Sequence, residues 1–167
     1  TVILASSDGL IVFDTGRHLF HTQKIIDNAR KAGQPVAAII NSHWHLDHIS
    51  GNIPLRELFP GAAIYSNGAA VENALRTFLA RGRESNAKML EDPTLTPEII
   101  DEISIDAATV EQGELLEPTV SIERAQAITI GGRRLEFHTA AGASDGDIWV
   151  FDPASGVVMT GDLVTLP

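Results

Sequence analysis

Three of the six histidines of this chain lie close together, as His43, His45 and His48, with Asp47 among them. Side chains two residues apart in an extended segment point the same way, so His43, His45 and Asp47 can converge on one side. A turn after Asp47 can then bring His48 to the same place. Imidazole and carboxylate groups at this density suit one or two Zn²⁺ ions, with Fe or Mn possible where oxygen ligands dominate. We therefore expect a metal site at residues 43–48.

The elements that must position this run can be predicted from the preceding residues. Ile11–Phe13 has the pattern of a short buried strand, and Asp14-Thr15-Gly16 ends it. A helix is predicted from about residue 20 to 32, and Val36–Ile40 follows as a second buried strand. Strand, helix and strand in this space indicate a right-handed βαβ unit with parallel strands. Asp14 and the histidine run follow the carboxyl ends of those strands, where open α/β sheets bind their ligands.

The middle of the chain is predicted to be mostly helical. After a short helix at Ile53–Phe59 and a strand at Ala62–Tyr65, a helical insertion is expected at about 69–117. Its first helix carries Val71, Leu75, Phe78 and Leu79 at the spacing of one face. Its second begins at the N-cap Thr96 and at Pro97, and its apolar residues are expected to be buried: Ile99, Ile100 and Ile103.

The last third of the chain has the pattern of antiparallel strands. Gly131-Gly132 separates Ala127–Ile130 from Arg134–His138, which predicts a hairpin. Ile148–Phe151 and Val157–Thr160 are predicted to form a second hairpin. The predicted fold class is therefore α/β.

Composition limits the possible partners. Lys and Arg number 12 against 22 Asp and Glu, a formal net charge of −10, so binding to a nucleic acid is not expected. No apolar run approaches the ~20 residues of a membrane-spanning helix, so no membrane role is expected. The chain has no cysteine, so any metal ligands must be His, Asp or Glu. Cytoplasm and periplasm both remain open, and the start at Thr1 leads us to expect that both ends are incomplete.

The motif His-x-His-x-Asp-His, followed by Gly51-Asn52, resembles the signature of the metallo-β-lactamase superfamily. Asp14-Thr15-Gly16 resembles that family's upstream aspartate turn, Gly142–Asp147 resembles its Gly-His-Thr/Ser-x-Gly-Asp loop, and Gly161-Asp162 resembles its bridging aspartate. The resemblance implies a single αββα sandwich domain over residues 1–167, incomplete at its termini, with helices outside mixed sheets. It also implies a one- or two-metal site between the sheets.

The resemblance assigns roles to particular residues. The metal ligands would be His43, His45, Asp47, His48 and Asp162, with His43 and His45 at the first metal and the other three at the second. Asp47 would also act in catalysis by orienting the attacking hydroxide.

Ala143 departs from the family pattern, because it stands where the third histidine of the first metal site is expected. The chain is then a natural variant that uses mainly the second site, an inactive or engineered form, or one in which a neighbour replaces the histidine. The candidate neighbours are His138, Ser144 and Asp145. Asp14 is expected to support the metal loop by hydrogen bonding. The family's last histidine ligand is also expected beyond Pro167.

The resulting functional hypothesis is a metal-dependent hydrolase of a small-molecule ester, thioester, lactone or β-lactam. A histidine directly after the motif aspartate is similar to the glyoxalase II, lactonase and B3 β-lactamase branches. One alternative is a degenerate, non-catalytic metal-binding domain, which Ala143 motivates. Another is an aspartic protease, because Phe13-Asp14-Thr15-Gly16 imitates the catalytic triplet of that class, although such an enzyme needs two facing aspartates.

Overall fold

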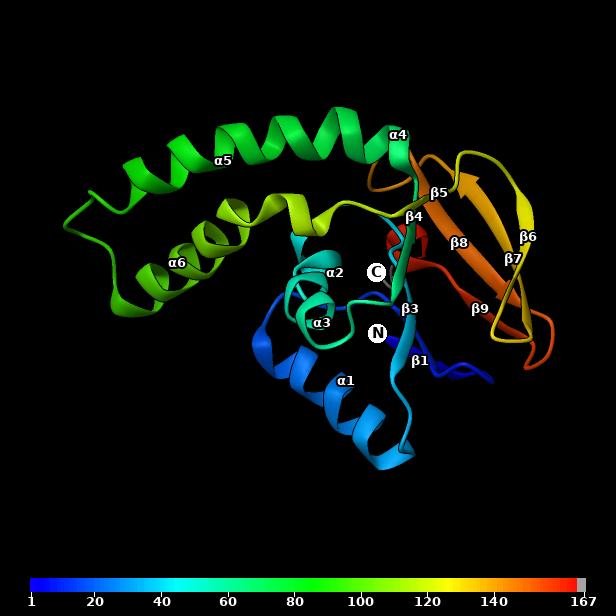
Figure 1. Cartoon of the computed structure of the whole chain (residues 1–167). Helices are drawn as coiled ribbons and strands as arrows, with labels where there is room; N and C mark the ends of the chain where they lie inside the picture. The colour runs from blue at the N-terminus through cyan, green and yellow to red at the C-terminus, as the bar shows by residue number, and fades with distance from the viewer. Residues whose placement is uncertain (165–167) are drawn as a thin grey trace.

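The structure, a computed structural model, describes residues 1–164 and contains two β-sheets (Figure 1). The first sheet has five strands in the order β1-β2-β3-β4-β5, and all neighbouring pairs except the antiparallel β1–β2 are parallel. Its strands are β1 (Val2–Ala5), β2 (Leu10–Phe13), β3 (Val36–Ile40), β4 (Ala63–Ser66) and β5 (Val120–Ser121). The predicted strands at β2, β3 and β4 are confirmed, whereas β1 and the two-residue β5 were not predicted.

The second sheet has four antiparallel strands in chain order. They are β6 (Gln126–Ile130), β7 (Arg133–Ala140), β8 (Asp147–Asp152) and β9 (Val157–Met159). Both predicted hairpins are confirmed. Gly131 and Gly132 take φ angles of 53° and 74°, the left-handed backbone that a tight two-residue hairpin turn requires.

Most of the helices lie on one side of the first sheet, opposite the second sheet, and some of them extend away from it (Figure 1). The first, α1 (Leu19–Ala32), ends at Gly33, whose φ is 63° and whose N–H caps the carbonyls of Ala29 and Arg30, as the sequence indicates. The remaining helical elements are α2 (Leu46–Ile49), α3 (Asn52–Leu58), α4 (Gly68–Ala70), the π-helical turn η1 (Val71–Leu75), α5 (Arg76–Met89), α6 (Pro97–Glu111), and the 3₁₀ turns η2 (Gly113–Leu116) and η3 (Gly161–Leu163). Among residues 1–164, no helix is both long and apolar enough to cross a membrane.

Three apolar clusters hold these layers together. The first lies between the sheets, where Phe13 and Ile40 meet Phe137 and Val150. The second lies between the first sheet and the helices α1 and α3, and the third packs α2 and α3 against α5 and α6. The period-2 burial of β7, with Leu135 and Phe137 inside, follows from packing one sheet face against another.

The helices α5 and α6 form an antiparallel pair, here called the helical arm (Figure 1). Thr96 caps α6 by accepting a hydrogen bond from the N–H of Ile99, as predicted. The predicted burial of Ile99 and Ile100 is wrong, because these side chains are 47% and 40% exposed. The arm has only two helices. The face of α6 that packs against α5 contains Val110, which is buried. Phe78 is also exposed, unlike Val71, Leu75 and Leu79.

The described residues form one helical layer and two sheets of the expected αββα sandwich, so the predicted α/β fold class is confirmed. Strands β2 and β3 are parallel neighbours and end at the same edge of the sheet. Asp14 directly follows β2, and the histidine run follows β3. Asp14 and the histidine run therefore lie at the same edge of the sheet, as predicted.

Candidate metal centre

Strand β2 ends in a residue with unusual backbone geometry. Asp14 has a φ of 55° and is buried, whereas most residues other than glycine avoid this region. Its Oδ1 accepts a hydrogen bond from the Ser42 N–H at 2.8 Å, and its Oδ2 accepts one from the Ser42 hydroxyl at 2.9 Å. The same Oδ2 lies 2.9 Å from Nδ1 of His48. The strained turn thus aims one carboxylate at the base of the histidine run.

The histidine run is not extended throughout, which corrects the sequence-based geometry. His45 keeps an extended backbone but is the N-cap of α2, and the helix begins at Leu46. Asp47 and His48 therefore lie on a helical turn, and that turn points His48 back toward His43. The ring centroids of His43 and His48 are 4.2 Å apart. A strand-to-helix corner, rather than strand alternation, brings these two imidazoles together.

A close approach of the chain brings the third member of the group. Gly161 has a φ of 54°, and a Cβ at this position would lie 2.4 Å from the Ser42 side chain. Only glycine fits both the left-handed backbone and this contact. The approach places Asp162 beside the histidines, with Oδ1 3.3 Å from Nε2 of His48 and Oδ2 3.9 Å from Nε2 of His43.

His43, His48 and Asp162 each offer a ligand atom, and these atoms all lie within 4.8 Å of one another. Nε2 of His43 is buried and has no hydrogen-bond partner among residues 1–164. A buried polar atom without a partner is costly, and a metal ion would satisfy it. Two imidazoles and a carboxylate are a common donor set for zinc. The residues present therefore fit a metal ion.

Two further predicted ligands lie at the rim of this group. The carboxylate of Asp47 is exposed, and its Oδ2 is 3.4 Å from Nε2 of His48. The His45 ring makes an edge contact with the His43 ring, with 4.5 Å between their centroids. The structure thus brings His43, His48 and Asp162 together, with Asp47 and His45 beside them.

Asp14 orients both imidazoles by accepting hydrogen bonds, directly from His48 and through Ser42 for His43. Because the Ser42 hydroxyl donates to Asp14, its oxygen is free to accept from Nδ1–H of His43 at 3.0 Å. Nδ1–H of His48 donates directly to Asp14. Each ring then carries its proton on Nδ1, which leaves the lone pair of Nε2 facing Asp162. This is the arrangement by which carboxylates and hydroxyls orient metal-ligating histidines in proteins.

His43 and His48 differ in proton affinity. Burial, and next the charge of His48, lower the pKa of His43, which favours the neutral form that binds metal. Burial also acts to lower the pKa of His48. The hydrogen bond and charge of Asp14, with the charges of Asp47 and Asp162, outweigh that effect and raise its pKa above the ordinary value. Without metal, His48 therefore holds its proton more tightly than His43 does.

A buried polar network fixes the backbone of the metal loop. Nδ2 of Asn52 donates to Oδ1 of Asn41 at 2.8 Å, and the Thr15 hydroxyl lies 3.0 Å from Oδ1 of Asn52. The backbone N–H of Thr15 donates to the carbonyl of His48 at 2.8 Å. Sequence analysis did not identify Asn41 or Ser42 as site residues. Their position directly before His43, between a buried strand and the motif, was the available signal.

The loop at 142–147 is closed by its own aspartate. Asp147 is buried and accepts hydrogen bonds from the N–H groups of Ala143 and Ser144 and from the Ser144 hydroxyl. The Ile148 N–H donates to the carbonyl of Ser42, which ties the loop to the metal group. Ala143 and Asp145 are exposed. Neither Ser144 nor Asp145 joins the group of His43, and the Ser144 hydroxyl is already used by Asp147.

His138 does not reach the site. It lies on β7 between the inward-facing Phe137 and the exposed Thr139, so its side chain is on the opposite face of the sheet from the core. There it stacks on Trp149 of the neighbouring strand, with 3.9 Å between ring centroids. The structure thus gives no support for His138 as a substitute ligand.

An open cavity of about 380 Å³ lies beside the two rim residues His45 and Asp47 and is also lined by Arg17 and Trp44. The Arg17 guanidinium pairs with both carboxylate oxygens of Asp106 on α6, at 3.0 and 3.1 Å. This ion pair joins the helical arm to the turn that contains Asp14. The cavity gives a small molecule access to the ligands from solvent.

The sequence profile of the metallo-beta-lactamase superfamily matches residues 1–166, so the chain belongs to that superfamily. A linear primary-alkylsulfatase of Pseudomonas sp. (strain ATCC 19151) is 36% identical over 50 residues, which are 29% of this chain and 10% of the relative. A hydroxyacylglutathione hydrolase of Synechococcus sp. (strain JA-3-3Ab) is 20% identical over 140 residues, 84% of this chain and 39% of the relative. The chain thus spans well under half the length of these two relatives.

Solved structures agree on the fold. The protein TTHA1623, solved in a di-iron-bound form, superposes with a TM-score of 0.61 at 18% identity, over 99% of this chain and 67% of that one. At such identity the match supports the fold alone. The superfamily assignment predicted from the histidine motif is confirmed, and the superfamily is one of metal-binding proteins that are mostly hydrolases.

Proposed function

We propose that this chain is a metal-dependent hydrolase that cleaves an ester, thioester, lactone or β-lactam. The observation that carries the proposal is the buried Nε2 of His43, without a partner among the described residues and directed at His48 and Asp162. An open cavity lies beside His45 and Asp47, the two residues at the rim of this group. The proposed ion is Zn²⁺, one or two per chain, with Fe or Mn as the other candidates.

The proposed function gives the residues of the site three roles: metal ligation, catalysis and orientation of the ligands. His43, His48 and Asp162 would hold the ion, with His45 and Asp47 completing its ligands. When bound, the ion would supply a nucleophilic hydroxide at neutral pH and polarise the substrate carbonyl. The exposed carboxylate of Asp47 would orient the attacking hydroxide. Asp14, through Ser42 and His48, would keep both imidazoles in the metal-binding tautomer.

The proposal is tested by turnover of a panel of activated substrates: a carboxylic ester, a thioester, a lactone, a β-lactam and a sulfate ester. We expect hydrolysis of at least one by the Zn²⁺-loaded chain, loss of rate with a chelator, and recovery on adding Zn²⁺. Asp47→Asn should lower kcat by about 10²–10⁴-fold, whereas Asp145→Asn, at an exposed loop residue outside the group, should not. Activity that survives the chelator would contradict the proposal.

The alternative is a domain of the same fold that binds metal without catalysis. Ala143 favours it, because an alanine in an exposed loop supplies no ligand where the family has histidine. Ala143→His separates the two ideas. If the Zn²⁺-loaded chain turns over nothing in the panel and Ala143→His does, then the scaffold is that of a hydrolase and this chain has lost the activity. If neither is active, the non-catalytic function is correct.

A further inference from the structure

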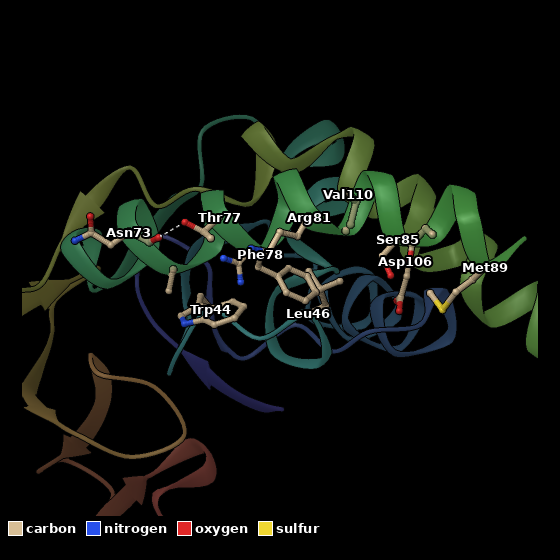
Figure 2. Close-up of a pocket in the computed structure, with 13 residues that line it drawn as sticks. Trp44, Leu46, Asn73, Thr77, Phe78, Arg81, Ser85, Met89, Asp106 and Val110 are labelled. Atoms are coloured by element: carbon tan, nitrogen blue, oxygen red, sulfur yellow. Dashed lines mark hydrogen bonds between the residues drawn. The ribbon is translucent and has the colours of Figure 1, made fainter.

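A second cavity, of about 560 Å³, runs between the metal loop and the helical arm and is here called the arm groove (Figure 2). Its walls are mainly apolar, and the principal apolar lining residues are Trp44, Leu46, Phe78, Met89 and Val110. Its volume lies within the range of about 300–1,000 Å³ typical of small-molecule sites. The arm groove is therefore large enough for a ligand.

The arm groove adjoins the cavity beside His45 and Asp47. The two share Trp44, Leu46, Phe78 and Asp106, and the metal-side cavity adds His45 and Asp47. Trp44 lines both cavities. Its ring makes an edge contact with the His45 ring, and its ring centroid lies 5.4 Å from that of Phe78. A molecule in the arm groove therefore reaches the metal ligands without crossing the fold.

The exposed apolar residues of α5 line this groove rather than the core. Leu79 is the buried apolar residue of the helix, whereas Phe78 and Met89 are 39% and 42% exposed. These two lie eleven residues apart, which is three turns, so they share one face along about 16 Å of helix. Figure 2 shows Phe78, Ser85 and Met89 along the same side of the cavity. An apolar ligand would cover them.

Charge in the groove is small. Asp106 lines it, but its carboxylate is paired with Arg17. Arg81 is the other charged lining residue and is exposed, so its aliphatic stem can lie against the groove while the guanidinium stays in water. The occupant that these walls fit is uncharged and apolar along its length.

We propose that the arm groove binds the apolar chain of the substrate and places the hydrolysable group beside Asp47 and His45. This inference rests on the proposed hydrolase function, and it adds the substrate class: an ester or related acyl compound with a long unbranched apolar chain. Trp44, between two metal ligands in the sequence, contacts both the chain and the reacting end. It is a specificity-determining residue in this account.

The test measures binding alone, on chain freed of metal by a chelator, with the ketones butan-2-one to decan-2-one. These carry a carbonyl and an apolar chain but cannot be hydrolysed. Trp44 fluorescence reports binding in a Trp149→Phe background, because Trp149 stacks on His138 away from the groove. The dissociation constant should fall by about three- to fourfold for each added methylene, which corresponds to full burial of that group.

A matched pair of variants locates the binding. Ser85 and Ala87 are both exposed on α5, but only Ser85 lines the arm groove. Ser85→Phe should weaken decan-2-one binding by about tenfold or more, and Ala87→Phe should leave it unchanged. Phe78→Asp, at an exposed position, should weaken it as well and serves if Ser85→Phe does not fold.

The outcomes distinguish binding in the arm groove from hydrolysis at the metal site. Affinity that does not rise with chain length, or that falls equally in Ser85→Phe and Ala87→Phe, overturns the inference even if the metal-loaded chain hydrolyses short esters. Chain-length-dependent binding that Ser85→Phe abolishes supports the groove, even if the metal-loaded chain turns over nothing and the hydrolase proposal fails.

Discussion

Replacing Asp14 with asparagine should weaken metal binding, because it removes hydrogen bonds that orient two of the proposed ligands. Asparagine tolerates the left-handed φ of 55° at this position, and its Oδ1 can still accept from the Ser42 N–H. The amide nitrogen that replaces Oδ2, however, can only donate. It cannot accept the hydrogen bonds that Nδ1–H of His48 and the Ser42 hydroxyl donate to Oδ2 in the native chain.

The consequence reaches both histidines. Nδ1 of His48 would have to accept, which moves its proton to Nε2, the atom that faces Asp162. The oxygen of the Ser42 hydroxyl would accept a hydrogen bond from the amide. The hydroxyl would then donate its own hydrogen to Nδ1 of His43, with the same effect on that ring. Losses of metal affinity from such supporting groups are about 10–100-fold, or about 1.4–2.7 kcal/mol. Two affected ligands place the expected loss at the upper end.

The assay is a competition titration of Zn²⁺ against a chromophoric chelator, with circular dichroism to confirm that the variant is folded. Asp145→Asn is the control, since Asp145 is an exposed aspartate of the 142–147 loop outside the metal group. Imidazole ¹⁵N shifts of the metal-free chain report the tautomers directly. A folded Asp14→Asn chain that binds Zn²⁺ as tightly as the native chain would refute this reasoning.

Three other substitutions test separate parts of the structure. Asp152 is fully buried, and burial alone would raise its pKa. The hydrogen bonds and ion pair with Arg133, and the hydrogen bonds from Ser155 and Ala154, outweigh burial and lower that pKa. Asp152→Asn should therefore lower the free energy of unfolding by up to about 3 kcal/mol at neutral pH. Because that pKa is depressed, the stability is present above the unfolded pKa of about 3.9 and is lost as pH falls through the folded pKa, so urea titrations of the two chains should converge in acid and stay apart at pH 7. Asn52→Leu leaves the Asn41 amide buried without its partner and should cost about 1–3 kcal/mol; thermal unfolding that matches the native chain would contradict the role of this network. Gly161→Ala adds a Cβ 2.4 Å from Ser42 at a φ of 54° and should displace Asp162. The affinity for Zn²⁺ should therefore fall more than in the control Gly156→Ala, where a left-handed glycine has open space around it. Equal losses of affinity in the two variants would contradict the role of Asp162 as a ligand.

Local sequence patterns predicted the elements of the fold well. The βαβ unit, both hairpins and the capped ends of α1 and α6 follow from period, glycine and proline signals that act within a few residues. The short edge strand β5 was missed because two residues carry no pattern. The exposure of Ile99 and Ile100 was missed because a helix pattern shows which residues share a face, but not whether another element covers that face.

The candidate site was only partly predictable for the same reason. The histidine motif and Asp162 are local signals, and they identified the group that the structure assembles. The relay from Asp14 through Ser42 depends on contacts between residues 28 positions apart, and the groove depends on how the arm folds back over Trp44. Neither is encoded in a short pattern. For His138, by contrast, a local pattern determines the position, because strand alternation places its side chain on the far face of its sheet.

The central claim, that His43, His48 and Asp162 hold a catalytic metal, is tested most directly by metal content. Chain dialysed against Zn²⁺ and then against metal-free buffer should retain about one ion by elemental analysis, as a closed set of His and Asp ligands would. His48→Ala should retain almost none, and Ala143→His should rise toward about two. Negligible zinc in the native chain and in Ala143→His, with iron and manganese equally absent after the same treatment, would contradict the account.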